Sequence, residues 1–251
     1  MPAARRAGSQ RRLVVIDAGH GGPDKGMSGP IGTGARIHEK DITLQVSRRV
    51  GTKLKAMGVD VLHTRTTDTL VALSDRGRIA NDAGGDLFIS IHVNAANPTW
   101  KSPGAARGFE TYFLAEARTE DARRVEQMEN ESVQYEEVAD TRKGDPLSFI
   151  VADMLQNEHL RESSDLAELI QRRLGGSHPG PNRGVKQAGF RVLVTAFMPS
   201  VLVEIGFGTN AEEARYMTSP AGQEEIANAI VAATLEYLER YERRVGGGAG
   251  A

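Results

Sequence analysis

The sequence predicts an α/β fold, in which a mixed, twisted sheet is flanked by helices and carries a helical insertion. Short runs of β-branched and aliphatic residues, such as LVVID and LFISIH, are typical of strands that are buried on both faces of a sheet. These runs alternate with segments whose apolar residues recur at helical spacing, an order that favours an α/β sandwich. The strand pattern disappears between about residues 117 and 174 and then returns.

The predicted elements follow from these patterns in chain order. We expect strands at residues 12–17, 59–64, 87–92, 108–114, 190–195 and 201–205. A helix is expected to begin near Glu39 and to end at Gly58, because apolar residues recur every four positions between them. Further helices are expected at residues 73–83 and 221–242, and two more fill the insertion, separated by TRKGDP. Residues 1–11 are expected to be a flexible leader, residues 12–244 one domain, and residues 245–251 a disordered tail.

Composition excludes several classes of function and of site. The formal net charge is -2, and no basic stripe with interleaved aromatic residues is present, so nucleic-acid binding is not expected. No apolar run is long enough to span a membrane, and the basic start lacks the apolar core of a signal peptide. The chain has no cysteine. Histidine and carboxylate side chains are therefore the plausible ligands for any metal ion.

Three polar residues lie at or near the carboxyl ends of predicted buried strands. They are His20, His92 and Glu204. Because ligands and catalytic groups collect at this edge of open α/β sheets, we expect the three side chains to form one site. Glu39 begins a helix and lies on its sheet-facing side. Two histidines with nearby carboxylates indicate a metal centre for hydrolysis, in which the metal activates water and a separate carboxylate acts as general base.

Four sequence blocks carry a family resemblance. DAGHGG, HEKD, SIHVNA and VEIGFGTN occur in this order. Together they resemble the zinc-dependent N-acetylmuramoyl-L-alanine amidases of bacterial cell-wall turnover. The resemblance implies one Zn²⁺ per chain, with His20, Glu39 and His92 as its ligands and Glu204 as the catalytic carboxylate. It also implies a reaction on peptidoglycan, the hydrolysis of the amide between the lactyl group of N-acetylmuramic acid and the L-alanine of the stem peptide.

Other interpretations of these residues stay open at this stage. Glu39 could be an acidic residue favoured near a helix N-terminus, with His38 as the rival ligand. Glu204 could form a buried ion pair with Arg183 or Arg191.

Candidate substrate contacts lie in two of the loops and strands beside the site. Asn94 follows His92 in the SIHVNA block, and Arg183 and Gln187 lie in NRGVKQAGF; each could contact substrate or play a structural role. Arg65 and Asp68 are expected to fix a turn. His63, His159 and His178 have no evident metal partner.

The insertion resembles a regulatory element. It is similar to that of the longer periplasmic amidases of cell division, in which an inserted helix covers the active site, places a glutamate on the zinc, and is displaced by an inactive LytM-like activator. In a helix over residues 125–139, Glu129 lies on a face of apolar or small residues, while Glu131 points away. Glu129 is therefore the candidate autoinhibitory metal contact, with Glu136 and Glu126 as alternatives. The helix could also be a charged, solvated one without any metal contact.

The resemblance extends to location and partners. It implies a periplasmic protein whose signal sequence is missing from this chain, and we expect a monomer. The apolar stripe of the second insertion helix includes Leu155, Leu160 and Leu166; it either packs on the domain or forms a groove for the activator. Two rival functions are a zinc peptidase or deacylase acting on another amide, and a non-catalytic wall-binding module, which would have no need of Glu204.

Overall fold

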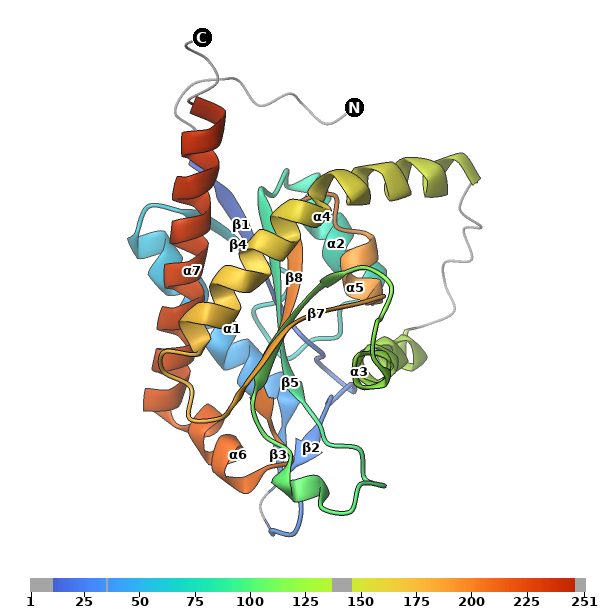
Figure 1. The fold of residues 1–251 in the computed structure, drawn as a ribbon, viewed down its shortest axis with the longest axis vertical. Helices are drawn as coiled ribbons and strands as arrows, with labels where there is room; N and C mark the ends of the chain where they lie inside the picture. Colours follow the sequence, from blue (N-terminus) through green and yellow to red (C-terminus); the bar gives the residue numbers. More distant parts are fainter. Residues whose placement is uncertain (1–10, 35, 137–145, 247–251) are drawn as a thin grey trace.

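A six-stranded mixed sheet forms the centre of the protein (Figure 1). The computed structural model describes residues 11–34, 36–136 and 146–246, with the side chains of residues 146–158 and 245–246 excepted. Across the sheet the strand order is β4-β1-β5-β8-β6-β7. The strands are β1 (Leu13–Ala18), β4 (Asp60–His63), β5 (Leu87–Asn94), β6 (Phe109–Leu114), β7 (Asn182–Ala188) and β8 (Ser200–Phe207). A separate ribbon pairs β2 (Ser28–Gly29) with β3 (Ile37–His38).

The pairing explains why the sheet is mixed. Strands β4, β1, β5 and β8 are parallel, and β6 runs antiparallel to β8. Strand β7 then pairs in parallel with β6 at the edge. The carboxyl ends of β1, β5 and β8 therefore lie at the same edge, beside the amino end of β6.

Helices cover both faces of the sheet. Helices α1 (Glu39–Ala56), α4 (Pro146–Leu174) and α7 (Pro220–Gly246) pack on one face, and α4 lies against α7 (Figure 1). Helices α2 (Leu73–Asp82), α3 (Glu120–Asn130) and α5 (Arg191–Val194) contribute to the opposite hydrophobic cluster. The short helix α6 (Ala211–Thr218) precedes α7.

Alternation along the strands assigns side chains to these two faces. Ile91, Val93, Val203 and Ile205 belong to the cluster beneath α1, α4 and α7. Successive side chains of a strand point to opposite faces. His92 and the residues that alternate with this apolar set, including Glu204, therefore point toward the face of α2, α3 and α5.

The predicted strand at residues 190–195 is wrong. This segment is the single-turn helix α5, and the edge strand is β7, which precedes it. The segment RVLV buries its apolar residues Val192 and Leu193 in the cluster of α2 and α3, which a helical turn accomplishes as well as a strand does. Strand β7 has the sequence NRGVKQA and is mostly half-buried, so it lacks the apolar pattern of a central strand.

The first insertion helix is shorter at its carboxyl end than predicted. Helix α3 ends at Asn130 rather than continuing to residue 139, and a 3-10 helix, Glu131–Tyr135, follows it. The chain then turns, and the Glu136 carboxylate accepts a hydrogen bond from the backbone N–H of Leu73 at the start of α2. Residue 139 lies outside the described residues, as do residues 1–10 and 247–251 of the predicted leader and tail.

The remaining predicted elements agree with the structure to within a few residues. The six strands include five of those predicted, and α1, α2, α4 and α7 match four predicted helices. Among the described residues no helix combines the length and apolarity needed to cross a bilayer.

Candidate functional site

Three neighbouring strands bring the predicted site residues together. His20 follows the end of β1, and His92 and Glu204 lie in β5 and β8. The register pairs the Cα atoms of His92 and Glu204, so these side chains are neighbours on one face of the sheet. The His20 and His92 ring centroids are 5.1 Å apart.

Glycines around the histidines leave the space that the rings need. A Cβ atom at Gly19 would lie 2.5 Å from the His92 ring, and one at Gly26 would lie 2.6 Å from the His20 ring. His20 itself has φ 60, a left-handed conformation that is rare for a residue with a side chain. Gly19 of the DAGHGG block and Gly26 after it therefore permit the two imidazoles to approach each other closely.

Two buried arginines hold this loop in place. Arg76 donates hydrogen bonds to the Asp17 carboxylate at 2.8 Å and to the carbonyls of Ala18 and His20. Arg65 donates to the carbonyls of Ala18 and Gly19. The sequence predicts that Arg65 and Asp68 both fix a turn. Arg65 does so through these contacts, and the Asp68 carboxylate accepts a hydrogen bond from the Gly22 N–H. The buried Asp17–Arg76 pair was not predicted from the sequence.

Glu39 contacts both histidines from the first turn of α1. Its Oε2 atom lies 3.2 Å from His20 Nε2, and its Oε1 atom lies 3.1 Å from His92 Nδ1. The same carboxylate accepts hydrogen bonds from the backbone N–H groups of Met27 and Val93. His38, its rival, instead contacts the Ser28 hydroxyl with its ring.

Asp24 orients the His20 ring and was not identified from the sequence. Its Oδ2 atom lies 2.8 Å from His20 Nδ1, so His20 Nε2 is directed toward Glu39 and Glu129. Ser132 Oγ also lies 3.2 Å from His20 Nδ1. A carboxylate four residues after a histidine in a glycine-rich loop was the available signal, since ligand histidines commonly pair with a carboxylate through their other nitrogen.

Glu129 of α3 reaches the two histidines. Its Oε2 atom lies 3.1 Å from His20 Nε2 and 2.6 Å from His92 Nδ1. The other two candidate glutamates are engaged elsewhere: Glu126 accepts from the Gly189 N–H, and Glu136 accepts from the Leu73 N–H. Glu131 is exposed, as the helical face predicted.

Glu204 is buried without compensation. It is fully shielded from solvent, and neither carboxylate oxygen has a hydrogen-bond partner among the described residues. The alternative ion pair is not formed: Arg183 pairs with Glu110 and Asp121, and Arg191 is exposed. A carboxylate without a partner in the interior is costly, which is typical of a functional group.

The charges of the cluster shift its proton affinities in opposite directions. Burial would lower the pKa of His92, but the carboxylates of Glu129 and Glu39 outweigh it and raise that pKa to about 9. Burial also opposes ionisation of Glu39, yet the two histidines hold its pKa well below its usual range. Burial raises the pKa of Glu204 well above its usual range, and the charges of Glu129 and Glu39 add to this effect. Among the carboxylates of the cluster, Glu204 is thus the one that most readily holds a proton, because the pKa values of Glu39 and Glu129 are lowered.

Four buried side chains offer ligand atoms for one metal ion. Potential ligand atoms of His20, Glu39, His92 and Glu129 all lie within 4.8 Å of one another. Two imidazoles with carboxylate oxygens form a donor set that suits Zn²⁺. Glu129 Oε1 is buried without a hydrogen-bond partner among the described residues, and His92 Nδ1 faces only the Glu39 and Glu129 carboxylates, as expected of atoms that could bind a metal ion.

Comparison with known proteins shows the family of the chain. The family model described as N-acetylmuramoyl-L-alanine amidase (Amidase_3) matches residues 14–236. The chain belongs to this amidase family. It is 33% identical to the N-acetylmuramoyl-L-alanine amidase AmiA of Escherichia coli, over 97% of this chain and 81% of the relative. It is 31% identical to AmiC of Neisseria meningitidis over 93% of this chain, but spans only 54% of that relative.

A solved structure shares the fold. The N-acetylmuramoyl-L-alanine amidase from Clostridium difficile 630 superimposes with a TM-score of 0.68 and is 28% identical, over 92% of this chain and 98% of that one. The mixed sheet flanked by helices, predicted from the sequence, is therefore the fold of this amidase family.

The three candidate substrate residues of this amidase-family chain lie near the site but are engaged in internal contacts. Asn94 is fully buried, and its amide donates to Glu110 while its carbonyl oxygen accepts from Arg124 of α3. Arg183 donates to Glu110 and Asp121. Gln187 donates to the carbonyl of Glu116.

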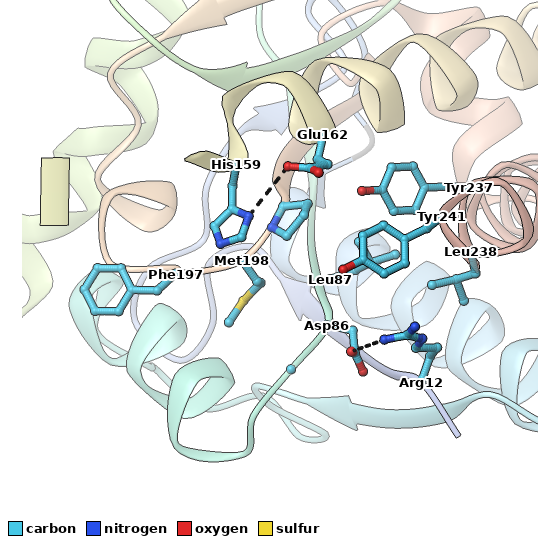
Figure 2. Close-up of a pocket in the computed structure, with 12 residues that line it drawn as sticks. Arg12, Asp86, Leu87, His159, Glu162, Phe197, Met198, Tyr237, Leu238 and Tyr241 are labelled. Carbon is cyan, nitrogen blue, oxygen red and sulfur yellow. Dashed lines mark hydrogen bonds and ion pairs between the residues drawn. The ribbon is translucent and has the colours of Figure 1, made fainter. Parts of the chain in front are cut away.

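Two cavities lie at opposite edges of the sheet, and one of them is at the histidine cluster. A cavity of about 180 Å³ opens beside His20 and Glu39 and is bounded by Glu129, Ser132 and Tyr135. A cavity of about 260 Å³ lies near the amino ends of β1, β5 and β8, at the opposite edge of the sheet (Figure 2). It holds the His159–Glu162 and Arg12–Asp86 pairs rather than a set of converging metal ligands.

The other histidines lie apart from the cluster. His178 is buried, with Nε2 3.0 Å from the Ile205 carbonyl and Nδ1 accepting from the Gly180 N–H. His63 is half-buried on β4. Neither belongs to the metal-ligand set identified among the described residues.

Proposed function

We propose that this protein is a zinc-dependent hydrolase of peptidoglycan that cleaves the amide between the N-acetylmuramic acid lactyl group and the L-alanine of the stem peptide. The observation that carries the proposal is the buried cluster of two histidines and a glutamate beside an unpartnered glutamate. Membership of the amidase family supports the choice of bond.

His20, Glu39 and His92 are the residues that would hold the metal. Asp24 orients one imidazole, and the backbone N–H groups of Met27 and Val93 orient the Glu39 carboxylate. Such fixed orientation stabilises a ligand set. When bound, Zn²⁺ lowers the pKa of water toward neutrality and polarises a carbonyl.

Glu204 is the proposed catalytic carboxylate. It lies beside His92, and burial raises its pKa above the usual range. A carboxylate whose pKa is raised is a stronger base, which favours acceptance of a proton from water and its return to the leaving nitrogen. A wall-binding module would gain nothing from a buried, unpartnered glutamate, so this residue favours the enzyme.

Helix α3 is proposed to inhibit the enzyme. The Glu129 carboxylate contacts both histidines, and it bounds the cavity that opens beside His20 and Glu39. A carboxylate in this position would both compete for the metal and exclude water. Activity then requires that α3 leave, which is a shift between a closed and an open state.

An activator of the LytM-like type is the proposed partner, acting in the periplasm on a monomeric amidase. It would bind the helical insertion and stabilise the open state of α3. Leu160 of α4 is 37% exposed while Leu166 is buried, so part of the predicted apolar stripe packs on the domain and part faces solvent; the side chain of Leu155 lies outside the described ones. Asn94, Arg183 and Gln187 stay candidate substrate contacts once α3 has moved.

The test of the reaction is the chemistry of the product. Muropeptides should release intact peptides with a free L-alanine amino group, and peptides lacking the sugar should not be cleaved. Glu204→Ala should reduce turnover at least about a hundredfold while it keeps its metal. Cleavage of the sugar-free peptides would instead favour the rival zinc peptidase or deacylase, and a fully active Glu204→Ala protein would refute the role of Glu204.

A further inference from the structure

Helix α3 places a second carboxylate on the sheet, beyond Glu129. Asp121, near its start, lies 2.9 Å from Arg183 and 2.8 Å from Lys186, both in the edge strand β7. Its pKa is lowered, because Lys186, Arg183 and Arg124 outweigh the effect of its burial. The insertion therefore engages the sheet through two acidic side chains at two separate places.

The two basic residues belong to a row of charged side chains on the sheet that extends to Glu204. The fully buried Glu110 of β6 pairs across the sheet with Glu204, and it contacts Arg183 at 3.1 Å and also Lys186. Arg183 and Lys186 thus supply two positive charges, of which Glu110 balances one. The second is balanced by Asp121, which departs together with Arg124 whenever α3 leaves.

The geometry points to a binding site for a carboxylate of the substrate peptide at Arg183 and Lys186, which Asp121 fills in the closed state. This inference rests on the proposed amidase function and names the part of the substrate that the site recognises. In the closed state Asp121 occupies the place of the peptide carboxylate, and Glu129 covers the histidines. Helix α3 therefore blocks two subsites at once.

Distances along the helix and across the sheet agree with this interpretation. The eight residues from Asp121 to Glu129 span about 12 Å of helix. Three strand spacings, about 14 Å, separate β5 with His92 from β7 with Lys186. An extended peptide covers this distance in about three or four residues. The recognised carboxylate therefore belongs to one of the first few residues after the scissile amide.

The side chains at the subsite are suited to exchange one carboxylate for another. Arg183 and Lys186 are 27% and 18% exposed, in contrast to the fully buried Glu110. A guanidinium beside an ammonium group forms charge-assisted hydrogen bonds with a carboxylate. Without Asp121, the pair would keep one positive charge that is not balanced by Glu110.

The experiment compares two muropeptides of equal length, with a carboxylate of the third peptide residue either free or amidated, in a Glu129→Ala background. We expect kcat/KM to be about tenfold or more higher for the free carboxylate, the usual effect of one charge-assisted contact. Adding Lys186→Gln should reduce this preference to less than about twofold, while Lys55→Gln, an exposed lysine of α1, should leave it unchanged. Arg183 and Asn94 still contact Glu110 in the Lys186→Gln protein, so it should fold.

A second measurement separates this inference from the proposed reaction. Titration with the free peptide should show several-fold tighter binding to Asp121→Asn than to the parent protein. Glu120→Gln, which changes an exposed carboxylate of the same helical turn, should bind the peptide as the parent does. If Glu129→Ala cleaves neither muropeptide but Asp121→Asn binds the peptide more tightly, the reaction is wrong and the subsite stands. A preference that survives Lys186→Gln, or equal binding by Asp121→Asn and the parent, would overturn the subsite.

Discussion

At the scale of single residues, the positions of the candidate ligands depend on buried groups that would not themselves contact the metal or the substrate. Asp17, the first residue of the DAGHGG block, accepts hydrogen bonds from Arg76, Thr64 and Ser90. The Arg76 guanidinium, with these hydroxyls, outweighs burial and lowers the pKa of Asp17. Because Arg76 also binds the carbonyl of His20, this buried pair connects the stability of the fold to the position of a candidate ligand.

We predict that Asp17→Asn lowers the free energy of unfolding by about 3 kcal/mol at neutral pH, since it leaves Arg76 buried without its counterion. A lowered pKa means that ionised Asp17 stabilises the folded state. This stabilisation is fully present above the unfolded pKa of about 3.9 and is lost as the pH falls through the folded value. The difference between variant and parent should therefore shrink below about pH 4 in urea unfolding. Asp75→Asn, at an exposed pair on α2, is the control and should show little difference at any pH.

Asp24 gives a second prediction at this scale. Asp24→Asn should weaken Zn²⁺ binding by about 10- to 100-fold, because the carboxylate that orients His20 is replaced by a neutral amide. Competition with a chromogenic chelator measures the affinity. Asp82→Asn, an exposed residue of α2, is the matched control. Equal affinities in all three proteins would show that the ring needs no orientation by Asp24.

At the scale of elements, the sequence predicted those whose apolar pattern is strong. Helix α1 and strands β1, β5 and β8 bury regular sets of aliphatic residues, and each was found within about two residues of its place. Strand β7 does not follow from the sequence because it is an edge strand of mixed polarity. The segment RVLV predicts a strand because its three apolar residues fit either structure. Contacts with distant chain segments decide such cases.

Helix α3 is anchored by side-chain contacts as well as by its apolar residues. Asn130 donates to the Gly189 carbonyl and accepts from the Arg191 N–H. We predict that Asn130→Ala increases amide exchange across residues 120–135 by about 5- to 30-fold, as expected for the loss of one or two hydrogen bonds worth about 1 kcal/mol each. Gln127→Ala, at an exposed position of the same helix, should not. Unchanged exchange in Asn130→Ala would mean that the apolar contacts alone hold α3.

At the scale of the whole molecule, the sheet order explains why distant blocks of sequence form one site. His20, His92 and Glu204 follow from the parallel order β1-β5-β8, and the sequence could predict that they converge. The sequence could not predict that β6 and β7 extend this row with Glu110, Arg183 and Lys186. No local sequence pattern indicates that β6 runs antiparallel to β8 or that β7 pairs with β6. The helical face favoured Glu129 among the insertion glutamates, and the path of the chain beyond Asn130 takes the alternative Glu136 to the Leu73 N–H instead.

Metal binding should stabilise the whole domain, because the ligands come from β1, α1 and β5. Zn²⁺ at a thousandfold excess over its dissociation constant should add about 4 kcal/mol. For a domain of this size that corresponds to a rise in melting temperature of about 10 °C. Calorimetry with and without a chelator measures it. In His92→Ala the rise should be small, and a full rise in that variant would place the metal elsewhere.

The central claim is that a zinc amidase is held closed by Glu129. The most direct measurement compares wall hydrolysis by the parent chain with hydrolysis by Glu129→Ala, with Glu126→Ala as a control and zinc content quantified in all three. We predict about one zinc per chain in all three proteins. The parent and Glu126→Ala should show little hydrolysis, because Glu126 accepts a hydrogen bond from the Gly189 N–H rather than contacting the histidines. Glu129→Ala should hydrolyse the wall at least about tenfold faster than the parent. Equal hydrolysis by the parent and Glu129→Ala, with zinc bound in both, would contradict the claim.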